Sequence, residues 1–287
     1  QGIESGLTAL YAHLRDTYGY AYYYCICETG TDEYTYGHDA DGNFKDADLS
    51  GVGQLNAQTS RSDALWGNAF TYINTASGII ENGTAAGTSE SLISEARFFR
   101  AYDYLRLVQT FGGVPLDFGA GELKFNTSPT RYSVRNTVPE VYTKAVFPDL
   151  KLAVENLPET GRLTGGLTKN AARLALAKAY LAYGWWLQNP KNIPTYPECD
   201  RTDPDGHDAQ WYFQEAYNLA VAGIKDPGPF ALQPTYYDVH VGSNDRNNEV
   251  MLYADHTENS EEFNGGSLSY GSGAAPDNFA VWMVTWN

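Results

Sequence analysis

The sequence predicts a mainly α-helical protein whose helix pairs stack into a superhelical scaffold, with long irregular loops and a few short strands. Six segments carry apolar residues at the helical spacing i, i+3, i+4, i+7. Most of them are bounded by residues that start or stop helices. Two are apolar on nearly every face, so each needs other helices on several sides. Short links between several of the segments favour antiparallel pairs, and stacked pairs form a solenoid.

The first three helices are predicted from apolar stripes and their boundary residues. The expected ranges are Ile3–Thr17, Ser62–Gly83 and Thr88–Phe111. Asn82-Gly83 is a typical C-terminal cap for the second helix. Gly112-Gly113 stops the third, and Pro115 prevents its continuation because proline lacks a backbone N–H. Between the first two helices lies a loop of residues 19–61, and loops of this length in compact domains are usually functional.

The last three helices follow the same signals. The expected ranges are Thr137–Leu157, Thr168–Leu187 and Asp208–Lys225. Pro139 suits the first turn of its helix, whereas Pro148 inside the same helix predicts a kink or a break. Residues Glu249–Ala254 are predicted to form a strand. Trp66, Trp185, Trp186 and Trp211 lie on helical stripes and are expected in the core.

The composition narrows the classes of partner. The chain has 287 residues and a net charge of −16, and aromatics make up 14% of it, with 22 Tyr and 6 Trp. An acidic excess argues against nucleic acid and against docking on an anionic membrane. It is compatible with neutral ligands, with cations or with simple solubility. The aromatic excess fits a core of large residues, and it also fits a face on which flat ligands stack.

The sequence carries few signals for membrane anchoring or for redox chemistry. No stretch of 18 uninterrupted apolar residues is present, so no spanning helix is predicted. The chain starts at Gln1 rather than Met, so we expect any signal peptide or anchor to lie outside it. Cys25, Cys27 and Cys199 lack the spacing of a zinc or redox site and are expected to be buried thiols, although one disulfide to Cys199 stays open.

One long motif points to a family. Residues 95–116 read Glu-Ala-Arg-Phe-Phe-Arg-Ala-Tyr-Asp-Tyr-Leu-Arg-Leu-Val-Gln-Thr-Phe-Gly-Gly-Val-Pro-Leu. This resembles the signature of the SusD/RagB family, in which an acidic residue and Ala-Arg-Phe-Leu-Arg-Ala precede an aromatic run and Phe-Gly-Gly/Asp-Val-Pro-Leu. Phe99 stands where the family usually has Leu. The spacing of Arg97, Arg100, Asp103 and Arg106 suits ion pairs within and between helices, so we expect this motif to be scaffold.

Shorter pieces follow in the order of the same family. They are Thr31-Asp32-Glu33, the run Trp66–Ile80, the helix ending at Pro158, the run from Leu167 to Ala172, and Asn247-Asn248-Glu249-Val250. The resemblance covers roughly residues 7–253. It places a helical domain at 1–257, with the binding loop 19–61 inside it. Residues 258–287 are then the start of a variable C-terminal portion that is mostly missing.

The resemblance implies a function as well as a fold. Such proteins have four tetratricopeptide-like helix pairs and a lipid anchor at the surface of the outer membrane. They capture oligosaccharide or polysaccharide without catalysis or cofactor, and they act with a SusC-like TonB-dependent transporter. The anchor would precede Gln1, outside this chain.

The residue chemistry agrees with sugar binding. A sugar ring has an apolar face and a belt of hydroxyls, so it suits an aromatic platform with amide or carboxylate groups at its rim. The loop and the C-terminal segment supply that mixture, and packing of the same aromatics onto the helices is the competing interpretation. Trp282 and Trp286 are four apart and could share one helical face. The predicted ligand-binding residues are Asp32, Tyr34, Tyr36, Asn43, Phe44, Asn56, Tyr270, Trp282 and Trp286.

Other chemistry has less support. The chain lacks a glycine-rich phosphate loop, His-Glu-x-x-His and Gly-x-Ser-x-Gly, so no enzyme is predicted. No cofactor is expected, although Asp39–Asn43 and Asp200–Asp208 alternate oxygen ligands as a weak calcium site would. Two alternatives to glycan capture stay open. One is a tetratricopeptide-type adaptor for a protein partner, and the other is a binder of a nutrient that is not a sugar. A hydrolase would need two facing carboxylates beside the aromatics.

Overall fold

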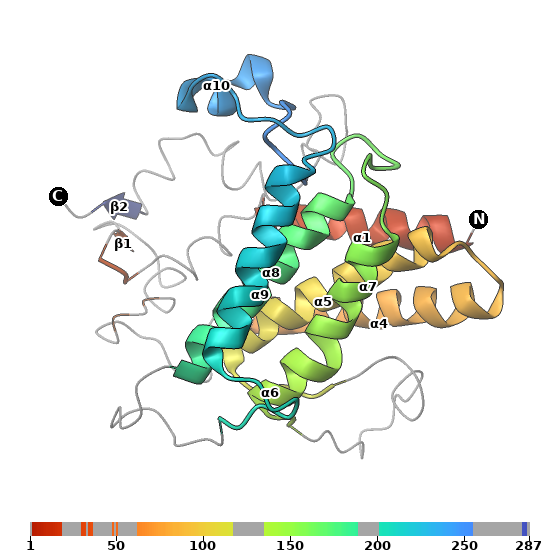
Figure 1. Cartoon of the computed structure of the whole chain (residues 1–287), viewed down its shortest axis with the longest axis vertical. Coiled ribbons are helices and arrows are strands. Elements are labelled where there is room, and N and C mark those ends of the chain that lie inside the picture. The colour runs from red at the N-terminus through yellow and green to blue at the C-terminus, as the bar shows by residue number, and fades with distance from the viewer. Residues whose placement is uncertain are drawn as a thin grey trace. The chain divides into compact units, whose positions relative to one another are not determined.

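The computed structural model describes residues 2–18, 30–32, 34–36, 48, 50, 62–116, 135–188, 201–254 and 283–285 (Figure 1). The helices are α1 Gly2–Tyr18, α4 Ser62–Ala85, α5 Glu90–Phe111, α6 Val138–Val141, the π-helix η2 Tyr142–Val146, α7 Phe147–Asn156, α8 Lys169–Gln188, α9 Ala209–Lys225, α10 Tyr236–His240 and the 3-10 turn η3 Gly242–Asn244. The strands are β1 Tyr34–Tyr36 and β2 Met283–Thr285. The predicted mainly helical class is therefore confirmed.

The chain contacts divide the protein into two compact units. The helical unit comprises residues 1–7 and 69–253, and the second unit comprises residues 8–68 and 254–287. The predicted domain boundary at residue 257 stays a prediction. No helix of the described ranges is long and apolar enough to cross a membrane.

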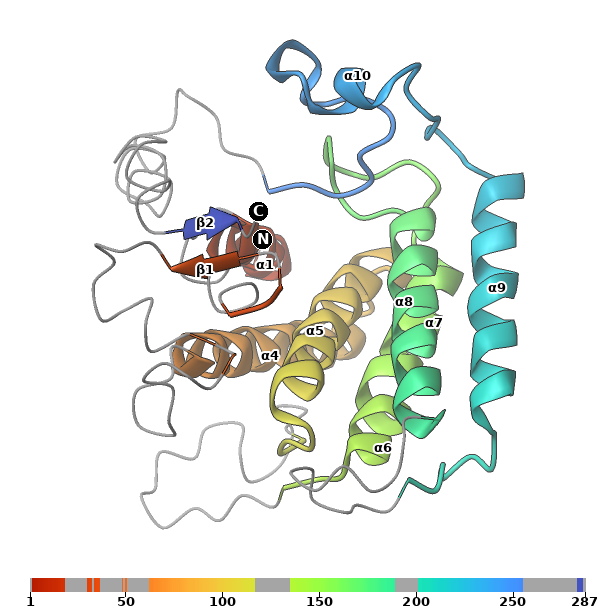
Figure 2. The same ribbon diagram turned by 90° about the vertical axis from the view of Figure 1, so that its left-hand side faces the viewer.

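The helical unit is built around α5 and a series of helices that alternate in direction. α7 packs on α5, α8 packs on α7, and α9 packs on α8, as Figure 2 shows. Gly184 of α8 makes the last pair close, because a Cβ at this position would lie 2.6 Å from Cε1 of Phe213 on α9. Residues buried in the helical unit include Ile73, Phe99, Tyr104, Leu107, Leu150, Leu176, Tyr183 and Tyr212.

The Gly-Gly of the long motif ends α5 as predicted. Gly112 has a φ of +71°, in the left-handed region that favours glycine. Gly113 must lack a side chain for another reason, because a Cβ there would overlap the carbonyl oxygen of Asn136. Arg135 donates hydrogen bonds to the carbonyls of Phe111 and Gly113, both at 2.7 Å. These bonds satisfy carbonyl groups that a helix end leaves unpaired.

Pro148 distorts its helix as predicted, and the structure shows how. The N–H of Phe147 donates to the carbonyl of Tyr142 five residues back, so η2 is a π-helix. A proline ring collides with the carbonyl four residues earlier in an ordinary helix, and the wider π-turn relieves that collision. The helix start is also as predicted. The Thr137 side chain accepts from the N–H of Glu140, and Glu140 accepts from the N–H of Thr137.

One predicted helix boundary and one predicted strand are wrong. α4 continues past Gly83 to Ala85, and the residue with the left-handed conformation is Gly87, with a φ of +67°. Gly83 serves packing instead, since a Cβ there would lie 3.2 Å from Cγ1 of Ile93. The strand predicted at Glu249–Ala254 is absent from the structure. The N–H of Glu249 bonds to the side chain of Asn247, and this local turn competes with a ladder.

The predicted burial of the four tryptophans is only partly correct. Trp185 is 58% exposed and Trp66 is 39% exposed, so their assignment to the core is wrong. Trp186 is half-buried and stacks on Tyr183, with ring centroids 5.9 Å apart. Trp211 is also half-buried. α8 is therefore covered on fewer sides than its apolar composition predicts, and this leaves apolar residues on its surface.

Candidate functional site

The predicted binding loop meets the C-terminal segment in a two-stranded antiparallel sheet. β1 pairs with β2 in the register Tyr34–Thr285, Thr35–Val284 and Tyr36–Met283. The two strands lie about 250 residues apart in the sequence, and both belong to the second unit. Two segments that the sequence suggested for sugar contact are thus joined through their backbones.

The predicted ligand-binding residues are placed unevenly. Asp32 is exposed, and Tyr34 and Tyr36 stand on β1. The other six lie outside the described residues: Asn43, Phe44, Asn56, Tyr270, Trp282 and Trp286. Residues 283–285 form a strand, so the proposal that Trp282 and Trp286 share a helical face is wrong. The platform assignment of these nine residues stays a prediction.

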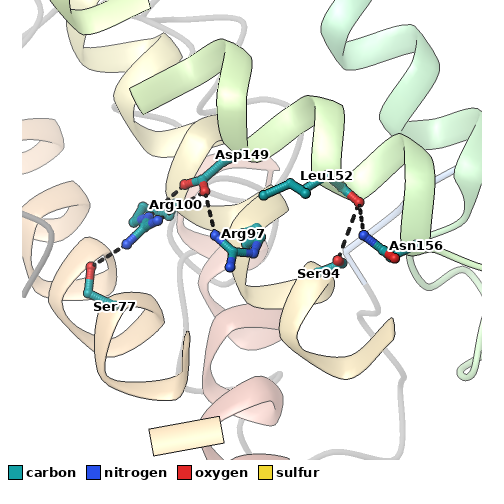
Figure 3. Close-up of polar contacts among 7 residues, drawn as sticks. All are labelled: Ser77, Ser94, Arg97, Arg100, Asp149, Leu152 and Asn156. Carbon is teal, nitrogen blue, oxygen red and sulfur yellow. Dashed lines mark hydrogen bonds and ion pairs between the residues drawn. The ribbon is translucent and has the colours of Figure 1, made fainter. Parts of the chain in front are cut away.

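The long motif forms a buried ion network between α5 and α7 (Figure 3). Arg100 donates to both oxygens of Asp149, from Nε at 2.6 Å and from Nη2 at 2.9 Å. Arg97 donates to Oδ1 of the same carboxylate at 3.2 Å. Arg100 also reaches the hydroxyl of Ser77 on α4 at 3.2 Å. Arg106 pairs with Asp103 within α5 at 3.4 Å, so the ion pairs predicted within and between helices are confirmed.

The acidic residue that opens the motif is also engaged. Arg162, in the link between α7 and α8, donates to Glu95 from Nε and from Nη2, both at 3.0 Å. The same link holds Gly165, whose φ is +68°, and a Cβ there would overlap the Tyr253 ring. Glu95, Arg97 and Arg100 of the motif thus bind other parts of the scaffold, as expected for a structural motif.

A second buried carboxylate organises the α8–α9 pair. Oδ1 of Asp203 accepts from the hydroxyls of Tyr183 and Tyr212, at 2.9 and 3.0 Å. Its Oδ2 accepts from the N–H of His207 at 2.9 Å. Burial raises the pKa of the Tyr183 and Tyr212 phenols, and the bonds to Asp203 raise it further. Both phenols are therefore neutral donors at ordinary pH.

The hydrogen bonds of Asp203 involve one of the two loops that the sequence suggested as weak calcium sites. In the loop Asp200–Asp208, Asp203 faces three donors, and Asp208 accepts from the N–H of Trp211 as the cap of α9. Across the described ranges, no three His, Cys, Asp or Glu side chains group closely enough to hold a metal ion. Asp39–Asn43 lies outside those ranges. Calcium binding stays a prediction at both loops.

Sequence reasoning missed one surface of the helical unit. α10 presents Tyr236 and Tyr237, which are 82% and 71% exposed. A signal for this helix was present in the sequence, because Thr235 and Asp238 have the spacing of a capping box. The Thr235 hydroxyl accepts from the N–H of Asp238 at 3.3 Å and donates to its carboxylate at 2.7 Å.

The architecture of the described residues by itself indicates the class of protein. The helical unit is an antiparallel scaffold held by buried arginine–carboxylate pairs, and the second unit contains the tyrosine-bearing strand β1 paired with β2. Residues 9–181, more than half of the chain, match the SusD-like family model described as "Starch-binding associating with outer membrane". The chain belongs to this SusD-like family.

Individual relatives agree with the family match. SusD-like protein P2 of Formosa agariphila is 30% identical over 197 residues, which cover 65% of this chain and 36% of that protein. A crystal structure with xylogluco-oligosaccharide has a TM-score of 0.66 at 21% identity, over 92% of this chain and 48% of the other. A laminarin binding SusD-like protein has a TM-score of 0.53 at 23% identity, over 65% of this chain and 40% of the other.

These structural matches show the fold, which is the tetratricopeptide-like helical fold predicted from the sequence. The matched part of the chain covers 48% and 40% of the two solved structures and 36% of the curated relative. What the relatives bind is therefore a guide to this chain rather than a property of it.

Proposed function

We propose that the protein captures an oligosaccharide or polysaccharide at the surface of the outer membrane without catalysing its cleavage. It then delivers the glycan to a SusC-like TonB-dependent transporter, and a lipid anchor outside this chain holds it to the membrane. The observation that carries the proposal is the family match over residues 9–181. Relatives of the same fold include one solved with xylogluco-oligosaccharide and one described as laminarin binding, which supports a glucan as ligand.

The pairing of β1 with β2 supports a location for the sugar contact. It joins Tyr34 and Tyr36 to the segment that precedes and follows β2, where Trp282 and Trp286 stand in the sequence. An aromatic-rich pair of segments suits the apolar face of a sugar ring. The net charge of −16 favours a neutral glycan over an anionic one.

Intrinsic tryptophan fluorescence tests the proposal across a panel of oligosaccharides. The panel should hold neutral glucans, among them malto-, laminari- and xylogluco-oligosaccharides, and one uronate-containing glycan as a charged control. Saturable changes with one neutral class, and none with the uronate, support glycan capture. A flat response across the neutral glycans would remove the support for sugar capture and favour a nutrient of another kind.

A second candidate function, a protein-binding adaptor, is favoured by one surface. Leu174, Leu181 and Trp185 share one face of α8 by their spacing of seven and four, and all are exposed. Tyr217 and Ile224 are exposed on α9. Trp185 contacts Phe213 at 5.2 Å between ring centroids, so the two helices present neighbouring apolar groups.

Large exposed apolar patches typically mark protein or membrane contacts. We propose that this α8–α9 stripe contacts the transporter, and that capture and adaptor roles coexist. Co-purification with a co-expressed SusC-like transporter tests this role directly. Leu181→Glu should weaken recovery of the complex, while Leu232→Glu, an exposed leucine in the link from α9 to α10, should leave it intact. Equal recovery of both variants would contradict the adaptor role of the stripe.

A further inference from the structure

The segment around α10 has the features of a second sugar-contact surface, separate from the β1–β2 segments. It lies beyond the C-terminal end of α9 in the helical unit (Figure 2). Two tyrosines are largely exposed to solvent here, Tyr236 and Tyr237. The ring of Tyr236 rests against His240 one turn later, with centroids 4.4 Å apart, so its outer face is the one left for a ligand.

The backbone that carries these rings is held by side chains rather than by a core. The backbone N–H of Gln233 donates a hydrogen bond to Oε2 of Glu249 at 2.7 Å. Asn247 donates from Nδ2 to the carbonyls of Val239 and Asn244, at 3.1 and 2.8 Å. The tyrosine rings take no part in these bonds. The segment is therefore ordered while its aromatic groups stay outside, and a preordered aromatic costs little entropy on binding.

An amide pair beside α10 supplies the matching polar groups. Nδ2 of Asn244 donates to Oε1 of Gln233 at 3.1 Å and to the carbonyl of Asp238 on α10 at 2.9 Å. Neither Nε2 of Gln233 nor Oδ1 of Asn244 bonds to another described residue, and both side chains are half-exposed. The pair thus leaves one donor and one acceptor toward solvent. A sugar hydroxyl donates one hydrogen bond and accepts others, so this combination suits it.

The chemistry of this surface differs from that of the α8–α9 stripe. The stripe is dominated by leucine, isoleucine and tryptophan, which offer few hydrogen-bonding groups to a hydroxylated ligand. α10 offers phenol rings with their hydroxyls and an adjacent amide pair. Asp238, Asp245 and Glu249 outnumber Arg246 in the same segment and disfavour an anionic ligand.

We infer that Tyr236 and Tyr237, with the Gln233–Asn244 amide pair, form an ancillary contact site for a neutral oligosaccharide. The inference rests on the proposed glycan capture and adds a second contact to it. A chain that reaches both contacts gains affinity through effective concentration, whereas a short oligosaccharide that reaches one contact does not. The site should therefore favour long glycans over short ones.

The test compares glycan affinities by calorimetry on the full chain. The probes are laminarin and maltodextrin as long glucans, with laminaritriose and maltotriose as short ones. The double variant Tyr236→Ala/Tyr237→Ala should lose about tenfold in affinity for the long glucan that the wild type binds, since each ring contact contributes roughly two- to tenfold. The double variant Tyr236→Phe/Tyr237→Phe keeps both rings and should retain most of the affinity.

Leu163→Ala is the control, because Leu163 is 42% exposed in the link between α7 and α8 and belongs to neither this surface nor the α8–α9 stripe. Its affinity should equal that of the wild type. If the wild type binds a long glucan and the Tyr236/Tyr237 alanine variant binds it equally well, the ancillary site is overturned and glycan capture stands. If the wild type binds no glucan at all, both fail. Unchanged circular dichroism and melting temperature in all variants confirm that the rings act in binding rather than folding.

Discussion

Arg100 binds Asp149 with two parallel hydrogen bonds, and this pair joins α5 to α7 inside the scaffold. Both side chains are buried, and Arg97 adds a third bond to the same carboxylate. Two-pronged arginine–carboxylate pairs are among the stronger hydrogen-bonded contacts in proteins. The arginines Arg97 and Arg100 of the motif therefore stabilise a helix interface.

Removing the shared carboxylate should destabilise the scaffold severely. Asp149→Ala leaves two arginines near α7 without their common partner, and breaking a buried pair costs about 3–5 kcal/mol. Urea unfolding measures the loss. Lys144→Ala is the control, because Lys144 pairs with Glu140 on the surface, at 2.6 Å, and should cost at most about 1 kcal/mol. Similar losses in the two variants would contradict the assigned role of Asp149.

Gly165 should tolerate no side chain. Gly165→Ala forces a left-handed residue to carry a Cβ, and that atom would overlap the Tyr253 ring. We expect a loss of free energy of unfolding of about 2–4 kcal/mol from strain and overpacking together.

Gly206→Ala separates the two causes. Gly206 has a similar φ of +77°, but no other atom lies within 4 Å of the position that a Cβ would take there. This variant should lose only the backbone part, about 1 kcal/mol. Equal losses from Gly165→Ala and Gly206→Ala, measured by urea unfolding, would show that the contact with Tyr253 contributes nothing.

Stability should fall at high pH because of the buried phenols. Burial raises the pKa of Tyr142, Tyr180, Tyr183 and Tyr212 above the ordinary value of 10.0. A phenol gains its charge on losing a proton, so the unfolded chain releases protons above pH 10 that the folded chain keeps. The stabilising contribution is therefore complete below pH 10 and is lost as the pH rises further.

The expected slope is up to about 1.4 kcal/mol per pH unit for each such phenol. Unfolding by urea between pH 8 and 11 measures it. Tyr183→Phe should flatten the slope, whereas Tyr237→Phe, at an exposed tyrosine, should leave it unchanged. A wild-type stability that is level from pH 8 to 11 would contradict the burial of the four phenols.

The helices could be predicted from the sequence because their signals are local. Caps, stop residues and the disruptive Pro148 act within one or two turns, and the structure follows them closely. Trp185 shows the limit of that approach. Its stripe predicts burial, but burial depends on which neighbouring helix covers the stripe, and spacing carries no information on that.

The prediction of a strand at Glu249–Ala254 was wrong for a similar reason. Its composition favours a strand, but Asn247 offers the backbone a local turn, and the choice depends on a partner strand far away in the sequence. The pairing of Tyr34–Tyr36 with Met283–Thr285 could not be predicted either, because nothing local specifies a register across such a distance.

Breaking the β1–β2 pairing should weaken glycan binding if the proposed location is correct. Replacing β2 by Met283→Gly, Val284→Pro and Thr285→Gly removes its capacity to pair. We expect roughly tenfold weaker affinity from the lost preorganisation. The control Met283→Leu, Val284→Ile and Thr285→Val keeps strand-forming residues and should bind normally. Undiminished affinity in the first variant would place the sugar contact elsewhere.

Calorimetric titration of neutral glucan oligosaccharides into the protein, with chromatography of the sugar afterwards, tests the central claim most directly. We expect a saturable binding isotherm for one glucan class and recovery of the oligosaccharide at its original length. Shorter products after incubation would contradict non-catalytic capture, and the absence of binding across the glucans would contradict glycan capture itself.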